Sequence, residues 1–101
     1  MDNIERILKR YPDRIPVILI PLNKDIGLKK YKYLVHPTIK IGHFIYTLLL
    51  NNNLKSSSGI YLTTQKGNMI STQDTFEYLY HNFKSNDEAL YLNVIKENVF
   101  G

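Results

Sequence analysis

The feature that most constrains the fold is an unbroken apolar run at residues 15–20, in which β-branched side chains dominate. A short run without polar alternation is typical of a strand that is buried on both faces of a sheet. Pro16 has no N–H to donate, so we expect it at the start of this strand or where no ladder hydrogen bond is required. Other segments of the chain must then provide helices that cover the sheet.

Three segments have apolar side chains at helical spacing, which is i, i+3 and i+4 in the first and extends to i+7 in the other two. They predict a short N-terminal helix and two core helices, at residues 3–10, 41–50 and 76–83. We expect Pro12 to end the first helix. We expect Ser71, Thr72 or Asp74 to cap the third.

Three further segments are predicted to be strands, at residues 31–35, 60–64 and 89–95. The last of them alternates, with Leu90, Leu92 and Val94 on one face. The turn at residues 23–27 should join the first two strands into an antiparallel hairpin.

The resulting order is helix, strand, strand, helix, strand, helix, strand. Two hairpins separated by a covering helix predict an α+β roll with the helices on one face. The common solution is the β-grasp, or ubiquitin-like, roll: a four-stranded mixed sheet, two core helices and one short N-terminal helix. We expect a single domain over residues 1–101, with the N-terminal helix in 1–11, the β-grasp core in 12–95 and a tail at 96–101.

Composition excludes several classes of function. The chain has no cysteine, so it has neither disulfides nor a thiol nucleophile of its own. Its net charge is +4, but the basic residues are scattered and do not indicate nucleic-acid binding. No signal peptide is visible and the longest apolar runs are too short to span a bilayer, so we expect a cytoplasmic protein.

The sequence offers no catalytic constellation. The histidines His36, His43 and His81 have no carboxylate partner at metal-ligand spacing, so we expect no metal and no cofactor. Asp87 and Glu88 are adjacent, and in a strand they would point to opposite faces. We therefore expect a protein that is not an enzyme.

Several motifs together resemble one family. Residues 9–18 (KRYPDRIPVI) are similar to the KYPDRVPVI-type signature of the lipidated autophagy modifiers, the GABARAP-like branch of the ubiquitin-like superfamily. Residues 32–35 (KYLV) resemble the strand that follows it, and residues 41–44 (IGHF) resemble the start of the family's central helix. Residues 90–92 (LYL) and 99–101 (VFG) match in order, and the resemblance covers nearly the whole chain.

The resemblance implies a ubiquitin-like modifier that acts in autophagosome formation. Activating and conjugating enzymes would transfer the terminal Gly101 to phosphatidylethanolamine, and every reactive cysteine would belong to those partners. The protein would be cytoplasmic, and on the autophagosomal membrane when it is conjugated. Since no residue follows Gly101, we expect no prior cut.

The family also binds short motifs of the form aromatic-x-x-aliphatic in cargo receptors and adaptors, as an added strand along the second strand. By position, the resemblance places an aromatic pocket at Ile7, Pro16, Ile18, Lys32, Leu34 and Ala89. It places an aliphatic pocket at Tyr33, Val35, Ile39, Phe44 and Leu48. A plain core would also account for many of these apolar residues. It cannot account for all of them, because strand alternation does not bury neighbouring residues on the same face.

The chain departs from the family at several positions. Ala89 stands where a bulky aromatic is usual, so we expect unfilled volume in the aromatic pocket and a preference for Trp over Phe or Tyr. Basic residues that usually follow the central helix are replaced by Leu50, Asn51 and Asn52. The family usually has another helix before the one at residues 3–10, and because almost nothing precedes residue 3 here we expect no counterpart of it.

Two other functions stay open at this point. One is the related autophagy modifier that is joined to a lysine of a protein, which also ends in an aromatic residue and glycine but lacks the YPDRIP block. The other is a β-grasp adaptor that binds peptides and is never conjugated.

Overall fold

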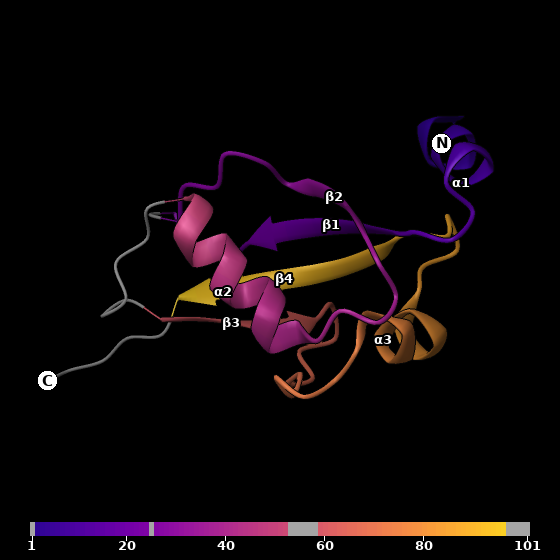
Figure 1. Ribbon diagram of the computed structural model, residues 1–101. Helices are drawn as coiled ribbons and strands as arrows, with labels where there is room; N and C mark the ends of the chain where they lie inside the picture. The colour runs from indigo at the N-terminus through magenta and orange to yellow at the C-terminus, as the bar shows by residue number, and fades with distance from the viewer. Residues whose placement is uncertain (1, 25, 53–58, 97–101) are drawn as a thin grey trace, which may run out of the picture.

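The computed structural model describes residues 2–24, 26–52 and 59–96 (Figure 1). It contains, in order, α1 (Asp2–Arg10), β1 (Ile15–Pro21), β2 (Lys32–Val35), α2 (Ile41–Asn51), β3 (Ile60–Thr64), α3 (Phe76–Phe83) and β4 (Leu90–Lys96). The predicted order of helices and strands is therefore confirmed, and the ends of the elements differ from the expected ones by only one or two residues.

The four strands form one mixed sheet in the order β2-β1-β4-β3. β1 pairs antiparallel with β2 and parallel with β4, and β3 pairs antiparallel with β4. Pro16 lies near the start of β1, opposite Leu34 of the edge strand β2. This arrangement is the β-grasp roll that the sequence predicts.

The core lies between one face of the sheet and the helices α2 and α3. β1 contributes Val17 and Leu19 to it, and the apolar alternation of β4 is confirmed because Leu90, Leu92 and Val94 are all fully buried. The helices contribute buried side chains at helical spacing: Ile41, Phe44 and Leu48 from α2, and Phe76 and Leu79 from α3.

α1 packs on the opposite face of the sheet, so the expectation that all helices share one face is wrong for this helix. Along β1, Pro16 and Ile18 alternate with the core residues and lie on the side where α1 contributes Ile4 and Ile7. With nine residues, α1 is only about 14 Å long and cannot cover the whole strand. β1 is therefore buried on one face, while Ile18 and Ile20 on the other are only half-buried.

The cap of α3 also differs from the prediction. Thr75, and not Ser71, Thr72 or Asp74, accepts the N–H of Tyr78 on its hydroxyl oxygen, at 3.2 Å. A bridge between Thr75 and Lys40 holds the chain extended up to this residue, so the cap is the residue directly before the predicted first residue of the helix. The Asp74 carboxylate instead accepts the N–H of Ser71 and closes the preceding turn.

Candidate functional site

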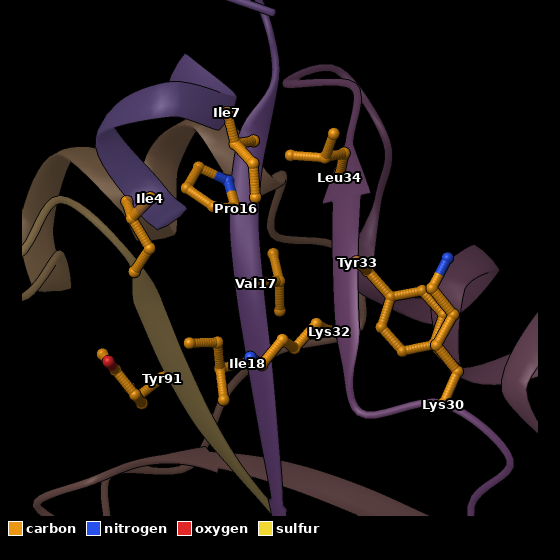
Figure 2. A pocket seen from close by; sticks show the side chains of 10 residues that line it. All are labelled: Ile4, Ile7, Pro16, Val17, Ile18, Lys30, Lys32, Tyr33, Leu34 and Tyr91. Carbon is orange, nitrogen blue, oxygen red and sulfur yellow. The ribbon is translucent and has the colours of Figure 1, made fainter. Parts of the chain in front are cut away.

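A cavity of about 490 Å³ lies between α1 and the sheet (Figure 2). Its walls come from α1, β1, β2, β4 and the loop before β2, through Ile4, Ile7, Pro16, Val17, Ile18, Lys30, Lys32, Tyr33, Leu34 and Tyr91. Most of these side chains are apolar, so the cavity suits a hydrophobic or aromatic group.

Sequence and packing together explain why this cavity is open. Ile4 and Ile7 are one helical turn apart, so α1 directs both of them toward the strand. On β1, Pro16 and Ile18 are two residues apart and share a face. Leu34 of β2 is 37% exposed and lies at the rim.

Two lysines give the mouth of the cavity a positive charge. Lys32 alternates with Tyr33 on β2 and is exposed. The ammonium group of Lys30 lies 5.2 Å from the centre of the Tyr33 ring, a cation–π contact that Figure 2 shows at the β2 side. An acidic segment would be complementary to this side of the cavity.

Tyr91 lies at the other end of the cavity, across β1 from Leu34 (Figure 2). Its hydroxyl group donates a 2.5 Å hydrogen bond to the Asp87 carboxylate. This hydrogen bond lowers the pKa of Asp87 and raises the pKa of Tyr91. The Asp87 carboxylate also accepts the N–H of Ala89, so the turn before β4 holds the Tyr91 ring in place.

The structure brings together five of the six residues expected to form the aromatic pocket: Ile7, Pro16, Ile18, Lys32 and Leu34. Ala89 is not among the lining residues and is fully buried, so the expectation that it opens the pocket is wrong. Strand alternation puts positions 89 and 91 on the same face. Four residues that were not predicted for either pocket also line the cavity: Ile4, Val17, Lys30 and Tyr91. Tyr33, which was expected in the aliphatic pocket, lines it as well. Tyr91 could have been found from that alternation.

The residues expected to form the aliphatic pocket lie on the α2 side of β2, where they pack against one another. Val35, Phe44 and Leu48 are buried in the core, and the half-buried Tyr33 and Ile39 pack against it. The Tyr33 ring meets the Phe44 ring edge-on, with centroids 5.3 Å apart, and Phe44 meets Phe76 in the same way at 5.0 Å. Burial raises the pKa of the Tyr33 hydroxyl. The interior of this side of β2 is filled and only Tyr33 and Ile39 at its margin are half-buried, whereas the α1 side is open.

β2 is an edge strand whose only partner strand among the described residues is β1. The other edge of its backbone is therefore not used by a strand of the sheet. An extended peptide can add to such an edge through main-chain hydrogen bonds, with its side chains entering pockets on either side.

Within the part of the chain that the structure describes, no group of three or more His, Cys, Asp or Glu residues could hold a metal ion. His36 is close to Thr38, with 2.9 Å between Nδ1 and the hydroxyl oxygen, and His43 is exposed on α2. No helix in the same residues has the length and apolarity needed to cross a membrane. Gly101, the expected point of conjugation, lies outside the described residues.

Comparisons with known proteins agree on one family. A family model described as "Autophagy protein Atg8 ubiquitin like" matches residues 1–101. Autophagy-related protein 8h of Arabidopsis thaliana is 35% identical over 97 residues, which is 94% of this chain and 81% of the relative. Autophagy-related protein 8 of Schizosaccharomyces pombe is 34% identical over 99 residues, which is 96% of this chain and 81% of the relative. The crystal structure of Trypanosoma brucei ATG8 superposes with a TM-score of 0.84 at 27% identity, covering 99% of this chain and 87% of that one.

Proposed function

The chain belongs to the Atg8 family of ubiquitin-like autophagy proteins, and from that premise we propose that it is a modifier joined through Gly101 to phosphatidylethanolamine during autophagosome formation. Activating and conjugating enzymes perform the transfer. The protein resides in the cytoplasm when free and on the autophagosomal membrane when conjugated.

The chemistry of the chain supports this role for Gly101. A terminal glycine has no side chain, so a narrow enzyme channel can admit its carboxylate for adenylation and transfer. The chain has no cysteine, so any thioester intermediate must form on its partners. The segment before the tail is held by β4, where the N–H of Lys96 donates a 2.8 Å hydrogen bond to the Asn23 side-chain oxygen. β4 therefore fixes the point at which the described part of the chain ends and the tail begins.

We further propose that the protein binds cargo receptors or adaptors that carry an aromatic-x-x-aliphatic motif. The observation that carries this proposal is the apolar cavity between α1 and the sheet, which lies beside the unused edge of β2. The aromatic side chain of the motif enters the cavity, and its backbone pairs with β2. The aliphatic side chain docks on the other side of β2, where Tyr33 and Ile39 are only half-buried.

The test of conjugation is the mass of the C-terminal peptide isolated from cells. A phosphatidylethanolamine adduct on Gly101 is expected, and Gly101→Ala should abolish both the adduct and co-sedimentation with membranes. An adduct to a protein lysine would identify the protein-conjugated modifier instead. An unmodified glycine in cells undergoing autophagy would leave the unconjugated adaptor.

A further inference from the structure

The helix α2 is unusual because it carries no charged residue over its eleven positions (IGHFIYTLLLN). Its inner side is buried, as Ile41, Phe44 and Leu48 show. On its outer side Tyr46 and Leu50, one turn apart, are each 59% exposed. A helix that is apolar on both sides is normally buried on both sides. The exposed apolar side chains on the outer side of α2 therefore indicate that this side binds a partner.

The location of this helix indicates which partner. The last turn of α2 is joined to the loop after β1, because the N–H of Lys29 donates a 2.6 Å hydrogen bond to the Asn52 side-chain oxygen. That loop begins with Leu22, which is 56% exposed and whose N–H donates to the Val94 carbonyl oxygen at 2.9 Å. Figure 1 shows the end of α2, this loop and the end of β4 at the same end of the molecule.

The tail starts from this same end. Five residues follow Lys96, and a fully extended chain of that length spans at most about 17 Å. A lipid on Gly101 would thus keep the end of α2 close to the bilayer surface. The exposed lysines Lys24 and Lys29 of the neighbouring loop add positive charge there. Apolar and tyrosine side chains flanked by lysines are the combination that membrane interfaces favour.

We propose that Leu22, Tyr46 and Leu50 form a membrane-docking surface that inserts into the headgroup region when the chain is attached to lipid. The proposal rests on the proposed lipid conjugation. Leu50, Asn51 and Asn52 carry no charge, so this end of the helix is compatible with a bilayer surface. The cavity under α1 lies on the other face of the sheet and remains open to peptides while the surface is docked.

The experiment separates docking from enzymatic conjugation. The full chain, extended by a hexahistidine tag after Gly101, is tethered to phosphatidylcholine–phosphatidylethanolamine vesicles that contain a nickel-chelating lipid. Because the chain has no cysteine, Leu50→Cys and Tyr78→Cys each accept one environment-sensitive fluorophore. Tyr78 is the matched control, since it is 54% exposed but lies on α3. Thermal unfolding of each labelled protein confirms its fold.

Tethering should shift the emission at position 50 to shorter wavelength and leave position 78 unchanged. Adding Tyr46→Ser to the Leu50→Cys protein should reduce the shift. No shift at position 50, or equal shifts at both positions, would overturn the proposal. A shift that appears in solution as protein concentration rises, without vesicles, would also overturn it and assign the surface to a second copy of the chain. None of these outcomes bears on conjugation, which the mass of the Gly101 adduct decides separately.

Discussion

The two sides of the sheet at β1 and β2 carry similar apolar side chains but differ in how they are covered. On the α2 side Val35, Phe44 and Leu48 interlock and leave Tyr33 at the margin. On the α1 side the residues of the same two strands line a cavity of about 490 Å³. The difference lies in the covering helix, because α1 has nine residues and lies outside the main core, while α2 supplies three buried side chains to it.

This contrast shows that apolar residues in one hairpin can have two separate roles. The closed side contributes to stability, since its side chains are removed from water on folding. The open side leaves apolar surface exposed to water. A ligand that fills the cavity buries this surface, and the burial contributes to the free energy of binding. Substitutions on the two sides should therefore change different measured quantities.

The largest effect is expected for Leu48→Ala on the closed side. Leu48 is 2% exposed, so the substitution should lower the free energy of unfolding by about 2–5 kcal/mol. Leu34→Ala on the open side should lower it by less than about 1 kcal/mol, because that side chain is already 37% exposed. Urea unfolding of both variants measures the difference. Equal losses would mean that the two sides are covered alike.

A smaller loss of stability is expected for Ala89→Phe. Ala89 lies directly before β4 and is fully buried, so a phenyl ring should overpack its surroundings and cost about 1–3 kcal/mol. Thermal unfolding and titration with matched Trp and Phe peptides measure stability and preference in the same protein. An unchanged midpoint together with weaker binding of the Trp peptide than in wild type would restore Ala89 as a pocket residue.

Ile18→Ala should affect binding more than folding. Removing this half-buried wall of the cavity should weaken an aromatic-x-x-aliphatic peptide by roughly tenfold, which corresponds to about 1.4 kcal/mol. Leu19→Ala is the matched control on the same strand, because Leu19 is 2% exposed and faces the core. Calorimetric titration should show weaker binding for the first variant, and chemical unfolding should show lower stability for the second. The reverse pattern would contradict the assignment of the two faces.

The smallest effect concerns the hydrogen bond between Tyr91 and Asp87 at the end of the open cavity. This bond lowers the pKa of Asp87 in the folded state, so its contribution to stability is present above the ordinary Asp pKa. That contribution should be lost as the pH falls through the lowered pKa, in the acidic range below about 4. Thermal midpoints from neutral to acidic pH should fall less steeply for Tyr91→Phe than for wild type. Identical slopes would mean that the bond does not contribute to pH-dependent stability.

Much of the fold could be predicted because local sequence determines it. A strand is the structure that places the alternating residues Leu90, Leu92 and Val94 on one buried face. A helix is the structure that does the same for Phe44 and Leu48. The resemblance of the motifs to the family then identified five of the residues that line the cavity.

The remaining features depend on contacts between distant segments. Alternation puts Ala89 and Tyr91 on one face, but only the packing of the folded chain decides that the first is buried and the second lines the cavity. The cap at Thr75 depends on its bridge to Lys40, which lies far away in sequence. The position of α1 on the outer face follows from tertiary packing, because a short amphipathic helix fits either side of a sheet equally well by pattern alone.

The parallel pairing of β1 with β4 has a consequence for how the protein is made. β4 is the last strand to leave the ribosome, yet it lies between β1 and β3 and gives both of them a neighbour. Until it is synthesised, the first hairpin and β3 cannot belong to one sheet, and contacts between such distant segments form late in folding. The four-stranded sheet can therefore be complete only in a chain that has been synthesised at least to Lys96. Enzymes that recognise the folded domain would thus ignore nascent or broken chains that do not yet extend to the tail.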